Sequence, residues 1–92
     1  MSTTHWIGRD GLEQRLREAF APSELAVRDD SHHHAGHAGA LEGGHFHVTL
    51  RSLRFAGQSR MARHRLVYDA LGPLGPLGIH ALSIDARAPD EP

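Results

Sequence analysis

The 92-residue sequence contains no cysteine, no excess of basic residues and no long apolar run. The missing cysteine excludes disulfides, thiolate nucleophiles and any iron-sulfur cluster held only by this chain's own thiolates. Ten basic and eleven acidic residues leave the charge near neutral, which argues against nucleic-acid binding driven mainly by phosphate contacts. No segment approaches the roughly 20 apolar residues of a membrane span, and no signal-like segment opens the chain. A soluble, cytoplasmic protein without a membrane partner is expected.

Histidine is the residue type that stands out, with nine copies. A chain this short forms one domain and buries only about 60 to 65% of its unfolded surface, so a binding module is favoured over an enzyme. We expect a single domain over residues 1–92, with its core over about 9–88. A His- and Gly-rich loop is predicted at 31–44 and a frayed polar tail at 89–92.

Apolar residues at helical spacing predict a first helix from Arg9 to Phe20, with Asp10 as its N-cap or as an acid of its first turn. Ser59 is a suitable N-cap for another helix that runs to Leu71. Two prolines and three glycines over 72–78 allow at most a turn or a short distorted helix.

Alternating apolar and polar residues predict a short strand around 25–27, a longer strand over 45–51 and a last strand over 79–88. The strand-helix-strand part should cross over right-handed and make its two strands parallel. The sequence therefore predicts an α+β protein of order αββα(α)β, with helices covering one face of a mixed three-stranded sheet.

Short motifs of the chain resemble the BolA family in their order and spacing, over roughly residues 10 to 90. The matching segments are Asp29-Asp30-Ser31 with the loop that follows, His45-Phe46, Phe55-Ala56-Gly57-Gln58-Ser59, Arg63-His64-Arg65-Leu66-Val67-Tyr68 and Ile79-His80-Ala81-Leu82. The resemblance implies the BolA-like, type II KH-like fold. It also implies a small partner of monothiol glutaredoxins that shares a [2Fe-2S] cluster with them, in a family whose founding members were described as transcriptional regulators.

His80 opens the last predicted strand, on the same parity as Leu82 and Ile84, so its side chain is expected at the rim of the covered face. The residue alone allows two interpretations. It is either a half-buried, hydrogen-bonded histidine at a strand end or a metal ligand, since neutral imidazole suits iron, zinc and copper. In the BolA family the His of the Ile-His-Ala-Leu segment is the cluster ligand, so the resemblance implies that His80 binds iron.

Candidates for a second ligand come from the loop and from the start of the next strand: His32, His33, His34, His37 and His45. Spacing separates them poorly, and a contiguous histidine run also suits a solvated surface tract. The resemblance implies a second ligand from this loop, a His in one subgroup and a Cys in the other; the absence of cysteine places the chain in the His subgroup. Alignment on the family's Ser-His-x-His-Ala-Gly-His pattern makes His34 the leading candidate and His45 its rival.

Two imidazoles on one iron and two thiolates on the other form the Rieske type of ligation. The resemblance implies that both thiolates come from outside this chain, one from the active-site cysteine of the glutaredoxin and one from a glutathione. No cluster is expected to stay tightly bound to the isolated protein, which is expected to be a monomer or a weak dimer.

Five arginines lie within fifteen residues, at Arg51, Arg54, Arg60, Arg63 and Arg65. They form either a solvated surface, with Arg65 and Asp69 paired one helical turn apart, or a docking surface. The resemblance implies that the Arg-His-Arg helix and the loop before it face glutaredoxin or, in regulator members, DNA; the predicted binding residues there are Gly57, Ser59, Arg60, Arg63, His64 and Arg65. Gly57 is not part of a Gly-x-x-Gly loop, which weakens an RNA-binding analogy.

Catalytic arrangements fail on spacing, because Ser59 and His64 lie on different faces of a helix and no glycine-framed nucleophile turn is present. The leading hypothesis is a non-enzymatic glutaredoxin partner in iron-sulfur cluster assembly, trafficking or iron sensing. One alternative is a DNA-binding transcriptional regulator that acts through the Arg-rich, helix-turn-helix-like segment 51–68. Another is a zinc- or nickel-binding protein that uses its histidine loop.

Overall fold

The computed structural model describes residues 6–31 and 43–92. The elements follow in the order α1 (Gly8–Phe20), β1 (Glu24–Asp29), β2 (Gly44–Arg51), the 3-10 helix η3 (Leu53–Phe55), α2 (Arg60–Leu71), α3 (Leu74–Leu77) and β3 (Ile79–Arg87). The predicted α+β class is confirmed, with the short α3 in the segment where at most a turn or a distorted helix was expected.

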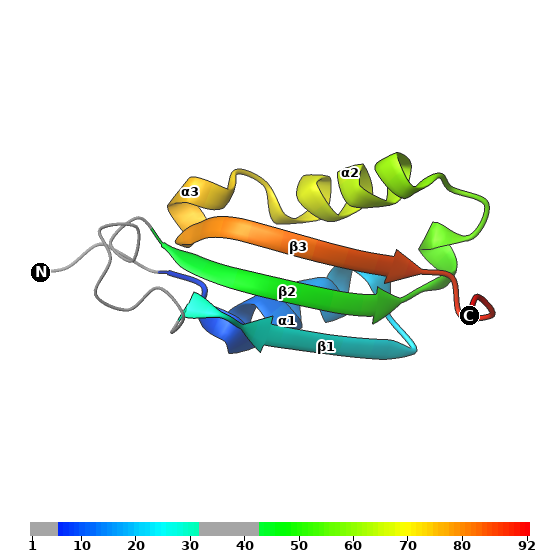
Figure 1. Cartoon of the computed structure of the whole chain (residues 1–92), viewed down its shortest axis with the longest axis horizontal. Coiled ribbons are helices and arrows are strands. Elements are labelled where there is room, and N and C mark those ends of the chain that lie inside the picture. Colours follow the sequence, from blue (N-terminus) through cyan, green and yellow to red (C-terminus); the bar gives the residue numbers. More distant parts are fainter. Residues whose placement is uncertain (1–5, 32–42) are drawn as a thin grey trace, which may run out of the picture.

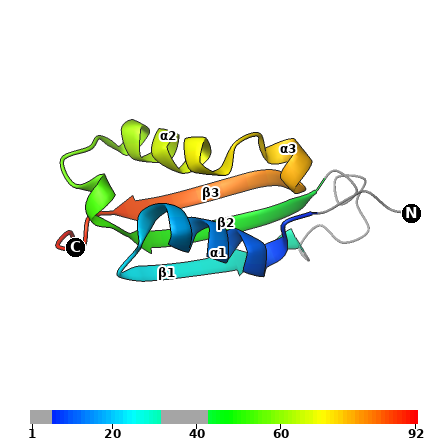
Figure 2. The same cartoon turned by 180° about the vertical axis from the view of Figure 1, so that it is seen from behind.

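β2 is the central strand of a mixed three-stranded sheet, since it pairs antiparallel with β1 and parallel with β3. Figures 1 and 2 show the sheet from its two sides, with α1 behind it in the first view and in front of it in the second. α2 and α3 run along β3 and form the crossover that the parallel pairing requires. No helix formed by residues 6–31 or 43–92 lies on the opposite face of the sheet.

The core lies between this sheet and the helices, as the alternation in β2 predicts. Phe46, Val48 and Leu50 are buried, whereas the residues between them lie on the open face. The helices and the turn after β2 add further buried side chains: Leu12, Leu16, Phe20, Phe55, Val67 and Leu71. One hydrophobic layer therefore holds α1 and α2 against the three strands.

The helix termini show where local sequence decides the structure. Ser59 caps α2 as predicted, because its Oγ accepts a hydrogen bond from the Ala62 N–H at 3.1 Å. Asp10 is an acid of the first turn of α1 rather than its N-cap; Ile7 takes the cap position, without a side-chain hydrogen bond. The Ile7 N–H donates instead to the Leu77 carbonyl at 2.8 Å. None of the helices in the described part of the chain is long and apolar enough to cross a membrane.

Ser52 is a buried polar residue that ties the end of α1 to the turn after β2. Its hydroxyl donates to the Phe20 carbonyl at 2.7 Å and accepts from the Arg54 N–H at 3.2 Å. Arg54 completes this junction, since its guanidinium lies over the Phe20 ring and donates to the Ala19 carbonyl at 2.8 Å.

The C-terminal residues differ from their prediction. A frayed tail was expected at 89–92, but Glu91 forms a two-point ion pair with Arg63, and its carboxylate also accepts from the Ala88 N–H at 2.8 Å. The prediction was wrong because the partner that anchors the tail lies on α2, far away in the sequence.

Candidate functional site

His45 and His80 lie side by side at one end of the sheet. His45 is near the start of β2 and His80 is near the start of β3, and because these strands are parallel, both starts meet at the same end. The two imidazole rings are 5.1 Å apart between centroids and are tilted by 40°. The structure therefore brings together two of the three predicted metal ligands.

An irregularity in strand pairing places His80. Gly44 pairs with Ile79 and His45 pairs with Ala81, which leaves His80 as an extra residue between two paired positions. Such a bulge redirects a side chain. Ile79 is 3% exposed and anchors the strand in the core, while His80 is exposed. His80 was predicted at the rim of the covered face, but the bulge breaks the parity on which that prediction relied, and the side chain is exposed.

The main chain around His45 is fixed on both sides. Its N–H donates to the Ser31 Oγ at 2.9 Å, and its carbonyl accepts from the Asp30 N–H at 2.7 Å. The Gly44 N–H donates to the Gly78 carbonyl at 2.7 Å, which joins β2 to the turn before β3. These bonds hold the histidine pair on a rigid support, the requirement for a well-positioned ligand set.

Trp6 covers the turn that precedes β3, a contact that the sequence did not reveal. A Cβ atom on Gly78 would lie only 2.1 Å from Trp6 Cγ, so the indole packs directly against the glycine backbone. Trp6 remains 48% exposed. An aromatic side chain thus lies beside the turn that leads into His80.

The histidine pair is an incomplete metal site by itself. Within residues 6–31 and 43–92, no group of three or more His, Cys, Asp or Glu side chains could hold a metal ion. His34, the leading second-ligand candidate, lies outside the described residues, as do His32, His33 and His37. Two adjacent imidazoles offer two nitrogen ligands, so any further ligand of a metal at this position comes from outside the described residues.

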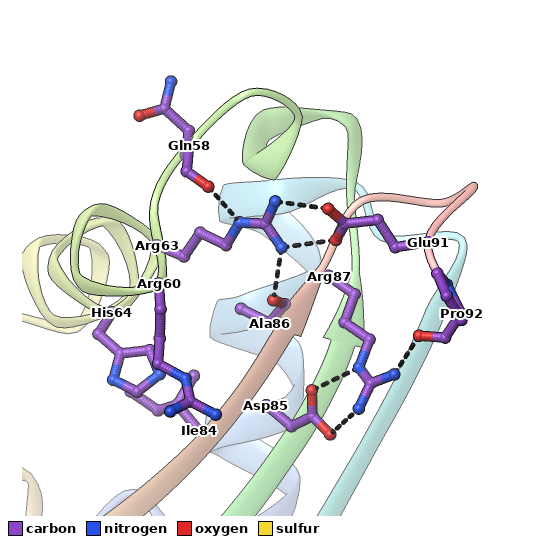
Figure 3. Close-up of a pocket in the computed structure, with 10 residues that line it drawn as sticks. All are labelled: Gln58, Arg60, Arg63, His64, Ile84, Asp85, Ala86, Arg87, Glu91 and Pro92. Atoms are coloured by element: carbon purple, nitrogen blue, oxygen red, sulfur yellow. Dashed lines mark hydrogen bonds and ion pairs between the residues drawn. The ribbon is translucent and has the colours of Figure 1, made fainter.

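A second site lies at the other end of β3, where an open cavity of about 680 Å³ separates that strand from α2. Figure 3 shows its lining, which is rich in charged side chains: Gln58, Arg60, Arg63, His64, Ile84, Asp85, Ala86, Arg87, Glu91 and Pro92. We call this the arginine cleft. With strands rising about 3.3 Å per residue, the cleft is roughly 20 Å from His80.

The predicted partner-binding residues divide between the cleft and its surroundings. Arg60, Arg63 and His64 line the arginine cleft, whereas Gly57, Ser59 and Arg65 are not among its lining residues. The Ser59 side chain acts as the α2 cap, and the Arg65 guanidinium contacts the Met61 sulfur. These three residues are exposed.

Two carboxylates of the arginine cleft are held in their charged form. Hydrogen bonds from Arg63 lower the pKa of Glu91 from its usual 4.5 to about 2, with a smaller contribution from the Ala88 N–H. Hydrogen bonds from Arg87 likewise lower the pKa of Asp85. The sequence did not reveal the roles of Asp85 and Glu91, since neither lies near the arginine run in the chain.

The comparisons with known proteins agree with this fold. A family model described as BolA-like protein matches residues 16–91. The relative named "Uncharacterized protein in cobS 5'region", from Sinorhizobium sp, is 44% identical over 84 residues, covering 88% of this chain and 90% of that protein. The solved structure of BolA1 from Arabidopsis thaliana aligns with a TM-score of 0.77 at 38% identity, covering 91% of this chain and 95% of the other.

Other curated relatives are longer: the chain spans 52% of the chloroplastic BOLA1 protein of Arabidopsis thaliana. The protein named "DNA-binding transcriptional regulator BolA", from Escherichia coli (strain K12), is 40% identical over 76 residues, covering 83% of this chain and 70% of that protein. With most of its length matched in both sequence and structure, the chain belongs to the BolA-like protein family.

Proposed function

We propose that this protein is a non-enzymatic partner of a monothiol glutaredoxin and shares a [2Fe-2S] cluster with it during iron-sulfur cluster assembly, trafficking or iron sensing. The observation that carries the proposal is the adjacency of the His45 and His80 rings, 5.1 Å apart at the end of the sheet where β2 and β3 begin. Neutral imidazole nitrogens are suitable ligands for iron.

The ligand count also supports sharing rather than independent binding. The chain has no cysteine, so the two thiolates of a Rieske-like arrangement come from the glutaredoxin's active-site cysteine and from a glutathione. The cluster is the cargo of this complex, and the isolated protein does not hold it tightly. The role of this chain is to present two imidazoles on rigid strands and to leave the partner's side open.

The second ligand beside His80 is either His45 or His34. His45 is favoured by its position in the structure, because its main chain is bonded on both sides and its ring already lies next to that of His80. His34 is favoured by the family pattern and follows Ser31, whose Oγ bonds the His45 N–H, by three residues. Single substitutions distinguish the two.

The test is a titration of a reconstituted [2Fe-2S] glutaredoxin-glutathione complex with this protein, followed by visible circular dichroism. Addition of the native protein should produce a new spectrum, and His80→Ala should not. Between His45→Ala and His34→Ala, the variant that loses the new spectrum identifies the second ligand. His47→Ala, which changes a histidine two residues further along β2 that has no assigned ligand role, is the matched control and should behave like the native protein. An undiminished new spectrum with His80→Ala would contradict the proposal.

A second candidate function is DNA binding, supported by the relative from Escherichia coli whose name describes it as a DNA-binding transcriptional regulator. Two of the arginines that would contact DNA are engaged within the chain, because Arg63 pairs with Glu91 and Arg54 donates to the Ala19 carbonyl. Binding through several phosphate contacts should weaken steeply between low and physiological salt, whereas cluster sharing should depend on His80 and little on salt. Duplex binding that persists at physiological salt, with no cluster spectrum, would make this candidate the better one.

A further inference from the structure

The arginine cleft contains a preformed carboxylate site centred on Arg63. Its Nε donates to the Gln58 carbonyl at 2.9 Å and its Nη1 donates to the Ala86 carbonyl at 3.1 Å. The guanidinium is therefore fixed between the loop before α2 and the edge of β3, and the Arg63 side chain is only 13% exposed. Its remaining N–H groups form a planar fork, the geometry that suits a carboxylate.

The present occupant of this fork is Glu91 of the same chain. The two Glu91 carboxylate oxygens accept from Arg63 Nη1 and Nη2 at 2.6 and 2.8 Å, as Figure 3 shows. Glu91 belongs to the segment after β3, which forms no further strand or helix, and its side chain is 38% exposed. Main-chain oxygens of the same segment accept from Arg51 and Arg87. A surface turn, rather than a buried element, fills the fork.

The cleft has room and charge for more than this one carboxylate. The cavity of about 680 Å³ remains open while Glu91 is in place. Among the side chains that line it, Arg63 pairs with Glu91 and Arg87 pairs with Asp85, whereas no carboxylate side chain of the described residues forms an ion pair with Arg60. Release of Glu91 would remove the acidic partner of Arg63, so that both Arg60 and Arg63 could bind an incoming carboxylate. Asp85 would stay paired with Arg87.

From this arrangement we infer that the arginine cleft binds an acidic segment of a protein partner, and that Glu91 is an intramolecular ligand which occupies the Arg63 fork until the partner's carboxylate displaces it. A carboxylate is favoured over phosphate because the fork already holds one in two-point geometry. The inference does not depend on cluster sharing, since the cleft lies at the opposite end of β3 from His80.

The test measures binding of a synthetic, end-blocked peptide with the chain's own tail sequence, Ala-Pro-Asp-Glu-Pro, by fluorescence anisotropy and by amide chemical-shift changes. Glu91→Gln removes the competing carboxylate from the fork and should bind the peptide about tenfold more tightly than the native protein, the change that ~1.4 kcal/mol gives. Asp90→Asn is the matched control: it removes the same charge from the same turn without touching Arg63, and should bind as the native protein does.

Two further arms make the result specific. A peptide with Gln in place of its Glu should bind Glu91→Gln weakly, which tests the carboxylate without altering the protein. Adding Arg63→Gln to Glu91→Gln should abolish peptide binding, whereas adding Arg65→Gln, on the same helix but outside the cleft, should not. The inference is overturned if folded Glu91→Gln binds the peptide no better than the native protein does, or if inorganic phosphate or duplex DNA competes more strongly than the peptide. No glutaredoxin or cluster enters this experiment, so its failure would leave the proposed function untouched.

Discussion

Substitution of Gly78 by alanine should destabilise the fold and expose Trp6. Gly78 has a positive φ of +81°, a region that costs an L-residue roughly 1–2 kcal/mol. Its new Cβ would also lie 2.1 Å from Trp6 Cγ, so the indole would have to leave its position. Gly57 is the matched control, because its φ is +74° and a Cβ there would meet nothing within 4 Å.

The two substitutions should differ by the packing of Trp6. Since Trp6 is 48% exposed, about half of its side chain, on the order of 100 Å², is covered. At about 25 cal/mol per Å², complete loss of that coverage amounts to an upper limit of about 2.5 kcal/mol. We therefore expect the free energy of unfolding to fall by roughly 1–2 kcal/mol in Gly57→Ala and by up to about 4 kcal/mol in Gly78→Ala.

Urea denaturation followed by far-UV circular dichroism measures both losses. The emission of Trp6, the single tryptophan of the chain, reports on its environment before unfolding. Gly78→Ala should shift native-state emission to longer wavelength, and Gly57→Ala should leave it unchanged. Equal losses of stability in the two variants, together with an unchanged Trp6 emission, would refute the packing of the indole on Gly78.

Three further predictions concern single hydrogen-bonding groups. Ser52→Ala should lower the free energy of unfolding by about 1–3 kcal/mol, measured by urea denaturation, because it leaves the buried Phe20 carbonyl without its donor. Ser59→Ala should cost about 1 kcal/mol through loss of the α2 cap, and Ser59→Asp should restore most of the stability in the same assay. The ion pair of Glu91 and Arg63 contributes fully above the usual carboxyl pKa of 4.5 and should be lost as pH falls through about 2, because the folded-state pKa is the lower one. Carboxyl carbon shifts in an NMR titration should follow this loss, and a Glu91 midpoint near 4.5 would contradict it.

Local patterns allowed much of the fold to be predicted. The alternation over 45–51 identifies both the strand and its buried face, because side chains on a strand alternate between two environments. Ser59 marks the start of α2 for an equally local reason, since a cap bonds an N–H only three residues ahead. Features of this kind need no knowledge of the rest of the chain.

The features that failed depend on distant partners. The outward position of His80 comes from a bulge, which is defined by how β3 pairs with β2 and has no signature in the four residues around it. The anchored tail depends on Arg63 meeting Glu91, and the cover over Gly78 depends on Trp6. The sequence named His80 and His45 as candidate ligands. The contact between their rings, however, depends on the parallel pairing of β2 and β3 in the folded chain.

The parallel pairing of β2 and β3 also sets the order in which the chain can assemble. β1 and β2 pair antiparallel, but β3 reaches β2 only after α2 and α3 have crossed over, and such non-local pairing is slow because the intervening loop must close first. We therefore expect β3 to be the last strand to dock. Since His80 is on β3 and His45 is on β2, the histidine pair is created by this final step. A partly folded chain holds only one of the two imidazoles in place, so the ligand pair that we propose for iron exists only in the fully folded protein.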